Sequence, residues 1–222
     1  MPEMYFRILN NEANGELTYL LADLATREAV LIDPHGRDLP VLAAMLSERD
    51  LRLRWVLRTH HHDALHTTEP ALLSRLDAPV VQGGVKGNES EIRGREIHDR
   101  DGAVLPFGGE LIHVVATPGH TPTCLSFAWR DRLFCGGLLA VAGCPHQASP
   151  LAPEALWDSV TQKVFTLPDE TLLFAGHDQR ARAVSTVLEQ RRWHPYFSGL
   201  TRDEFLAHMT ALSEGPVPAP IF

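Results

Sequence analysis

The chain has 222 residues, of which 44% are hydrophobic and 22% are charged, as in an ordinary globular protein. Its 20 basic and 28 acidic side chains give a net charge of -8, with no cluster of lysine and arginine. Such a chain is a poor candidate for binding nucleic acid or an anionic membrane surface, so small-molecule chemistry fits better. The length suits one sizeable core, and we expect a single domain over residues 1–222.

The first third of the chain predicts a short meander of strands and then a helix. Runs rich in β-branched, aromatic and aliphatic residues, separated by turn residues, predict strands over 5–9, 17–23 and 28–33. Apolar residues at helical spacing predict a helix over 39–49, and a buried strand over 53–57 follows. We then expect a helix over 69–76, a strand over 79–82 and a Gly-rich polar loop over 83–94.

The second half repeats this pattern, with strands expected over 110–117, 125–129, 133–135 and 171–175. Pro153 predicts the first turn of a helix that runs to about Leu167. Two more helices are expected, over 183–193 and from Thr201, whose hydroxyl forms a capping box with Glu204. Residues 215–222 have no helical pattern, so we expect an extended tail whose apolar end is able to dock on a partner.

Strands and helices in this order predict two sheets packed face to face with helices outside, which is an α/β fold of four layers, αββα. His60, His120 and His177 each follow a predicted strand. Because strand ends gather along one edge of stacked sheets, we expect a cleft there.

The N-terminus lacks the basic start and long apolar core of a signal peptide, and no run reaches the ~18 apolar residues of a membrane span. We therefore expect a cytoplasmic protein. Cys124, Cys135 and Cys144 have no CxxC spacing, which predicts neither a disulfide framework nor a zinc knuckle. Each is expected to be a small buried apolar side chain.

The segment Arg58–His66 contains four histidines and an aspartate directly after a predicted strand. Side chains of an extended segment alternate, so His60 and His62 can point the same way and converge on one ion. A solvated polar loop is the alternative interpretation. The histidines that follow two later strands favour a metal site.

Four segments, THHHDALH, TPGHT, LFCGG and AGHD, are similar to motifs of the metallo-β-lactamase superfamily. Longer runs, among them AVLIDP, LPFGGELIHVVATPGHTPTCLSF and KVFTLPDETLLFAGHD, resemble the persulfide dioxygenase and glyoxalase II (hydroxyacylglutathione hydrolase) branch in the same order. The resemblance covers nearly the whole chain and implies the four-layer αββα sandwich. It also suggests a homodimer.

Residue by residue, the resemblance implies a reduced metal site. The matched motif histidines are His60, His62, His120 and His177. The motif's Asp and His are replaced by Ala64 and Leu65, and the bridging aspartate by Gly137. Without these ligands neither a binuclear site nor an iron site of two histidines and an aspartate can form. We expect one divalent metal ion, zinc or iron(II), held by His60, His62 and His120.

The remaining site residues have less specific signals. His177 and Asp63 are candidates for positioning or moving a proton. A local bulge would let His66 act beside the metal or, with His177, at a second metal position. Arg180 and Arg182 are candidates for binding a glutathione carboxylate, the alternative being arginines on a solvated helix start.

Two functions from different classes follow. The first is a mononuclear metal-dependent enzyme, a hydrolase or an iron-dependent sulfur dioxygenase, acting on a glutathione-linked or other small thiol, persulfide or thioester. The second is a catalytically degenerate family member that serves as a binding or regulatory module, which the replaced ligands at Ala64, Leu65 and Gly137 favour.

Overall fold

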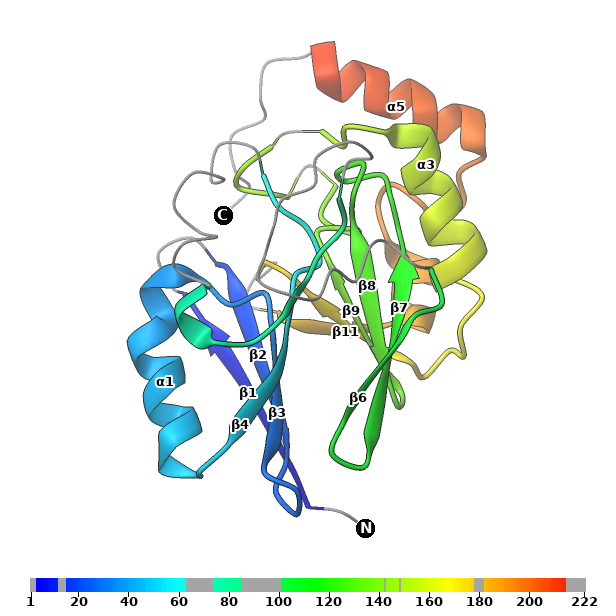
Figure 1. Ribbon diagram of the computed structural model, residues 1–222. Coiled ribbons are helices and arrows are strands. Elements are labelled where there is room, and N and C mark those ends of the chain that lie inside the picture. Colours follow the sequence, from blue (N-terminus) through cyan, green and yellow to red (C-terminus); the bar gives the residue numbers. More distant parts are fainter. Residues whose placement is uncertain are drawn as a thin grey trace.

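The computed structural model describes residues 3–11, 15–62, 74–84, 101–141, 143–147, 149–177 and 182–214. Their strands form two mixed sheets that face each other, with helices on the two outer sides (Figure 1). This arrangement confirms the predicted four-layer αββα sandwich.

The first sheet has the strand order β1-β2-β3-β4-β5. Its strands are β1 (Met4–Asn10), β2 (Leu17–Asp23), β3 (Glu28–Ile32), β4 (Arg52–Leu57) and β5 (Val80–Val81). The β1-β2-β3 meander is antiparallel, whereas β3, β4 and β5 run parallel. Helix α1 (Leu39–Glu48) makes the crossover from β3 to β4 and covers the outer face of this sheet.

The second sheet has the order β11-β10-β9-β8-β7-β6. Its strands are β6 (Val104–Phe107), β7 (Glu110–Ala116), β8 (Leu125–Trp129), β9 (Arg132–Gly136), β10 (Leu172–Ala175) and β11 (Val184–Thr186). Its outer face is covered by α3 (Pro153–Asp158), α4 (Val187–Trp193) and α5 (Arg202–Glu214).

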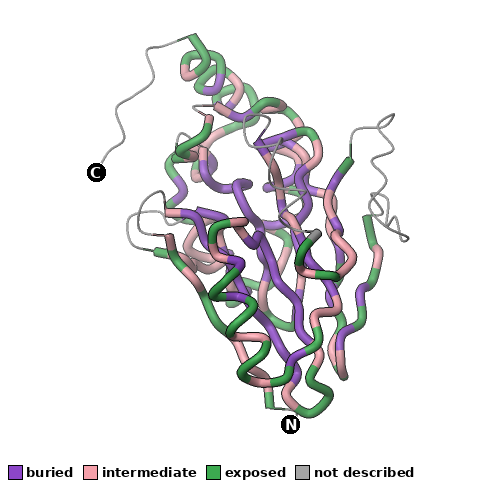
Figure 2. Tube along the Cα trace, turned by 60° about the vertical axis from the view of Figure 1, so that its left-hand side comes forward, coloured by how far each residue is buried: buried purple, intermediate pink, exposed green. Residues whose placement is uncertain are grey.

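The alternation of side chains along the central strands explains the layers. In β2, Leu17, Tyr19 and Leu21 point into the core between the sheets, whereas Leu20 and Ala22 pack in the outer core with α1. Both faces of β2 are therefore apolar and buried, as Figure 2 shows along the middle of the molecule. The second sheet follows the same rule, with its outer core formed against α3, α4 and α5.

The elements differ from the expectations at three places. The segment predicted as a helix over 183–193 begins instead with strand β11, because the β-branched Val184 and Thr186 lie where the chain pairs with β10. Helix α4 follows at Val187. Thr186 caps it by accepting a hydrogen bond from the Glu189 backbone N–H. The helix predicted from Pro153 continues after α3 as the π-helix Ser159–Val164. Strand β6 was not predicted, although it pairs along its whole length with β7.

Other expectations are confirmed or lie outside the described residues. The capping box at the start of α5 is present, because the Thr201 N–H donates to Glu204 at 2.7 Å and the Glu204 N–H donates to the Thr201 hydroxyl at 3.4 Å. The helix predicted over 69–76 falls largely outside, apart from the 3-10 turn Ser74–Leu76, and so does the tail 215–222. The single domain over 1–222 stays a prediction.

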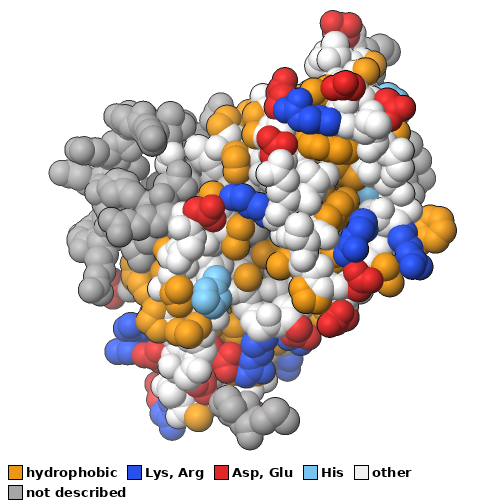
Figure 3. Space-filling model, turned by 90° about the vertical axis from the view of Figure 1, so that its right-hand side faces the viewer, with side chains coloured by type: hydrophobic (Ala, Val, Ile, Leu, Met, Phe, Trp, Pro, Cys, Tyr) orange, Lys and Arg blue, Asp and Glu red, His pale blue; other side chains and the backbone are white. Residues whose placement is uncertain are grey.

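The charge distribution on the surface and the character of the helices bear on partners. On the face turned to the viewer in Figure 3, acidic and basic side chains are interspersed rather than gathered by sign. None of the helices in the described ranges has the length and apolar character that crossing a bilayer demands.

Candidate metal centre

Histidines from three loops meet at one end of the two sheets. His60 and His62 follow β4, His120 follows β7, and His177 follows β10. The loops are held together by backbone hydrogen bonds: the Leu125 N–H donates to the Thr59 carbonyl at 2.7 Å, and the Gly176 N–H donates to the Gly136 carbonyl at 2.9 Å. The strand ends therefore position the histidines, as the sequence predicts.

His60, His62 and His120 form a compact triangle of imidazoles. Their ring centroids are 5.1 to 5.2 Å apart, and one donor atom from each lies within 4.8 Å of the others. The structure thus brings together the three residues that the sequence predicts as metal ligands.

Burial keeps the imidazoles of His60, His120 and His177 neutral. It is the main cause that lowers the pKa of His120 to about 3 and that of His177 to about 4, and the neighbouring imidazoles lower both further. The pKa of His60 is lowered well below its ordinary value for the same reasons. A neutral imidazole has a free nitrogen electron pair, which is what a metal ion needs from it.

A hydrogen-bonded chain orients the ring of His60. The Thr59 hydroxyl and the Thr59 backbone N–H both donate to the buried carboxylate of Asp33, each at 2.7 Å. Because the hydroxyl has spent its one hydrogen on Asp33, it accepts from Nδ1 of His60 at 2.8 Å. Nε2 of His60 is therefore left without a proton and faces the cluster, an arrangement typical of metal-binding histidines.

The loop after β9 orients the other two rings. Nδ1 of His62 donates to the side-chain oxygen of Gln147 at 3.1 Å, which leaves Nε2 of the neutral ring unprotonated. The Gln147 amide nitrogen donates to the carbonyl of His120 at 2.8 Å and lies 3.2 Å from Nδ1 of the same residue. Gln147 thus connects two histidines of the triangle.

The residues present fit a bound metal ion. Nε2 of His120 is buried and has no hydrogen-bond partner within the described part of the chain. A buried polar nitrogen without a partner costs about 1–3 kcal/mol. A metal ion would be the partner that this nitrogen shares with the unprotonated Nε2 atoms of His60 and His62.

Two glycines make room for these rings. A Cβ at Gly136, whose φ is +55°, would lie 2.5 Å from Cβ of Thr59 and 2.9 Å from Nδ1 of His60. A Cβ at Gly137 would lie 2.5 Å from Nε2 of His120. The ring of His120 therefore occupies the space of any side chain at the position where the resemblance puts a bridging aspartate.

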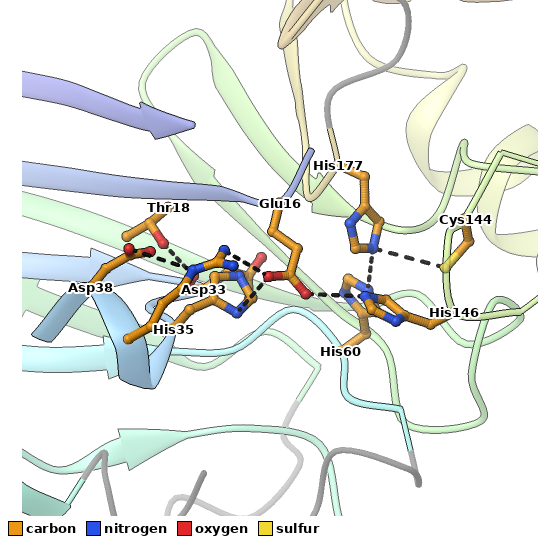
Figure 4. Close-up of polar contacts among 10 residues, drawn as sticks. Glu16, Thr18, Asp33, His35, Asp38, His60, Cys144, His146 and His177 are labelled. Carbon is orange, nitrogen blue, oxygen red and sulfur yellow. Dashed lines mark hydrogen bonds and ion pairs between the residues drawn. The ribbon is translucent and has the colours of Figure 1, made fainter. Parts of the chain in front are cut away.

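A second group of donors adjoins the triangle. Nε2 of His177 lies 3.3 Å from Nε2 of His60 and 3.9 Å from the thiol of Cys144 (Figure 4). The same thiol lies 3.4 Å from Nε2 of His62. One donor atom each from His62, Cys144 and His177 lies within 4.8 Å of the others. His62 belongs to both groups.

A buried carboxylate closes the side of the cluster. Glu16, 6% exposed, lies 3.0 Å from Nε2 of His146 through one oxygen, and 3.0 Å from Arg37 and 3.4 Å from His35 through the other (Figure 4). Glu16 also bridges to His177 through the backbone, at the point where the two sheets meet. This carboxylate places a negative charge next to the imidazoles of His35 and His146 and the guanidinium of Arg37.

Sequence reasoning missed several residues of this site, among them Glu16, Asp33, Cys144 and Gln147. The runs AVLIDP and CPHQ contain three of these four, and their polar ends after apolar segments were the available signal. Glu16 gave none, because it is one acidic residue in a turn.

The other predicted site residues are not part of the described cluster. Asp63, His66 and Arg180 lie outside the described residues. Arg182 makes a bidentate ion pair with Glu189 in α4, and its side chain is 57% exposed. A role for Arg182 in binding substrate stays a prediction.

Comparisons with known proteins find similar chains, although no family model matches this one. Human mitochondrial persulfide dioxygenase ETHE1 is 37% identical over 201 residues, which cover 88% of this chain and 76% of that protein. A hydroxyacylglutathione hydrolase of Hamiltonella defensa is 34% identical over 160 residues, covering 72% and 61%.

Solved structures give the same result for the fold. The crystal structure of ETHE1 from Myxococcus xanthus superimposes with a TM-score of 0.80 at 36% identity, covering 97% of this chain and 93% of that one. A metallo-β-lactamase from Staphylococcus aureus shares the fold, with a TM-score of 0.79 at 22% identity, covering 98% and 69%.

Proposed function

Because the chain belongs to the metallo-β-lactamase superfamily, in the branch of the persulfide dioxygenases and hydroxyacylglutathione hydrolases, we propose that it is a metal-dependent enzyme. Its substrates are glutathione-linked thioesters or small persulfides, which the names of those relatives specify. The cofactor is one divalent ion, zinc or iron(II). The alternatives of hydrolase and dioxygenase follow from which of these ions is bound.

One observation carries this proposal: three imidazoles from two separate loops converge, and Nε2 of the buried His120 has no other partner among the described residues. His60, His62 and His120 would hold the ion. When bound, zinc would polarise the thioester carbonyl and lower the pKa of water for hydrolysis, whereas iron(II) would supply the redox chemistry that oxygenation of a persulfide by dioxygen needs.

The protein's own groups orient the ligands and handle protons. Asp33 and Thr59 keep the proton of His60 on Nδ1, and Gln147 keeps that of His62 on Nδ1, so both Nε2 atoms stay unprotonated. His177 is neutral because burial lowers its pKa to about 4. Its Nε2, 3.3 Å from that of His60, is placed to accept or return a proton beside the reacting sulfur or oxygen.

The test is to load metal-free protein with zinc or with iron(II) and to assay both reactions. Oxygen uptake with glutathione persulfide measures the dioxygenase, and release of glutathione from a hydroxyacyl thioester measures the hydrolase. We expect one activity, with a loss of at least ~100-fold in His120→Ala. His113→Ala, which removes an exposed histidine in β7, is the matched control and should keep that activity. Equal activity of His120→Ala and the unchanged protein would refute the proposal.

A second function is favoured by the crowding at Gly137. The ring of His120 fills the space of the bridging aspartate that the resemblance implies, which suits a degenerate family member acting as a binding or regulatory module. Under this alternative neither metal supports either reaction, whereas glutathione or its persulfide still binds in calorimetry.

The remaining expectations about partners and location are also proposals. We propose a cytoplasmic homodimer that binds neither nucleic acid nor membrane. Light scattering after size-exclusion chromatography tests the dimer, and cell fractionation tests the location.

A further inference from the structure

Of the three cysteines, Cys144 differs from the others in what its sulfur faces. The sulfur of Cys124 accepts a hydrogen bond from the Thr121 N–H at 3.2 Å, and Cys135 is buried in the core beneath the helices of the second sheet. Cys144 is only partly buried, and its sulfur faces two imidazole nitrogens. Its thiol therefore lies among metal-binding groups rather than in apolar packing.

The spacing of these donors suits one tetrahedral ion. Zinc binds nitrogen at about 2.1 Å and sulfur at about 2.3 Å, which places two nitrogens about 3.4 Å apart and a nitrogen and a sulfur about 3.6 Å apart. The sulfur of Cys144 lies 3.4 Å from Nε2 of His62 and 3.9 Å from Nε2 of His177. Nε2 of His177 also lies 3.3 Å from Nε2 of His60, which belongs to the three-imidazole set.

The hydrogen bonds around the group favour ligation as well. Gln147 accepts the hydrogen bond from Nδ1 of His62, so that Nε2 of this ring is unprotonated and faces the sulfur of Cys144. Glu16, which contacts His146 and bridges to His177, adds a negative charge next to the group. Both features stabilise a cation at this point.

We propose that Cys144, His62 and His177 form a second, sulfur-containing metal position that overlaps the three-imidazole set and takes a thiophilic ion such as zinc. Thiolate prefers zinc and copper(I) over hard ions, whereas imidazoles alone suit iron as well. Because Nε2 of His62 has one electron pair, the two sets hold one ion between them. The thiol proton leaves to the solvent when the ion binds. The inference rests on the proposed function in one respect, namely that the histidine cluster binds metal.

The test is a titration of metal-free full-length protein with cobalt(II), the spectroscopic substitute for zinc. A cysteine ligand gives a near-ultraviolet charge-transfer band, and any tetrahedral site gives visible ligand-field bands. We expect both in the unchanged protein. In Cys144→Ser the charge-transfer band should vanish and cobalt affinity should fall at least ~10-fold. Cys124→Ser, whose hydroxyl keeps the contacts to Thr121, is the matched control and should retain the band.

Further variants separate this inference from the proposed function. His120→Ala removes one imidazole of the first set and leaves all three groups of the second, so it should keep the charge-transfer band. Ligand-field bands without a charge-transfer band, or a charge-transfer band that survives in Cys144→Ser, would overturn the inference and leave the three-imidazole site standing. Absence of all cobalt bands from folded protein, as judged by circular dichroism, would overturn both.

Discussion

Gly137→Ala is expected to damage the metal centre although it replaces none of the metal ligands. The new Cβ would lie 2.5 Å from Nε2 of His120 and 3.0 Å from its Cγ, whereas ordinary contact begins at 3.4 Å. The ring must therefore move by about 1 Å, because the backbone on the other side is fixed in β9. Metal–ligand distances tolerate shifts of about 0.2 Å, so His120 would no longer reach the ion.

The magnitude follows from this displacement. Misplacing one ligand should weaken metal binding by about 10–100-fold, or about 1.4–2.7 kcal/mol of binding free energy. Overpacking in the buried cluster should lower the free energy of unfolding of the metal-free protein by about 1–3 kcal/mol.

Competition with a chelator measures the affinity, and denaturant unfolding measures the stability. Gly84→Ala is the matched control, because no heavy atom of the described residues lies within 4 Å of a Cβ built there. The control should keep the affinity of the unchanged protein. If Gly137→Ala binds zinc and iron(II) as tightly as the unchanged protein does, then His120 is not a ligand and the reasoning is wrong.

Three further predictions concern the groups around the cluster. Asp33→Asn places an amide donor against the Thr59 hydroxyl, so this hydroxyl donates its hydrogen to Nδ1 of His60. The proton of the His60 ring then lies on Nε2, where it blocks the metal. Metal affinity should fall by about 10–100-fold in the same chelator assay. The pKa is about 3 for His120 and about 4 for His177 in the folded protein, so between pH 6.5 and about 4 these two histidines are protonated in the unfolded chain only. The unfolding free energy of metal-free protein, measured by denaturant titration, should therefore drop by about 2–3 kcal/mol per pH unit as the pH falls. Thr201→Ala removes the cap of α5 and should cost about 1 kcal/mol of unfolding free energy.

Each of these predictions has a control and a contradicting result. Asp50→Asn changes an exposed carboxylate and should leave metal affinity unchanged; an equal loss in both aspartate variants would disprove the proton chain. A double change of His120 and His177 to Gln should reduce this slope, leaving the part that His60 contributes, and an unaltered slope would mean that other groups cause it. Thr210→Ala changes a threonine in the interior of α5, where it caps no helix end, so it should not lower the unfolding free energy. A loss equal to that of Thr201→Ala would refute the capping role.

Patterns along single segments were sufficient to predict the layers of the fold. The run from Leu17 to Asp23 alternates between two buried faces, and the helical spacing from Leu39 predicts the cover of one of them. Local patterns also place His60 and His62 on the same side. Where the sequence prediction fails, a tertiary contact decides: residues 184–186 form a strand because β10 is available to pair with them.

The remainder of the site depends on contacts between distant loops. Cys144 meets His62 across 82 positions of the chain, and Gln147 meets it across 85. No periodicity relates these residues, because the loop after β9 is irregular and only its packing against the sheet ends sets the direction of its side chains. The same holds for Glu16, which becomes a site residue only because its turn joins His177 at the junction of the two sheets.

The central claim is that the imidazole cluster is a metal centre, and metal content tests it most directly. Elemental analysis should find about one equivalent of zinc or iron in the purified, tag-free protein and in His113→Ala. The iron content of His120→Ala, measured after the same purification, should be strongly reduced. Protein that holds no metal, even after reconstitution with zinc and with iron(II), would contradict the account.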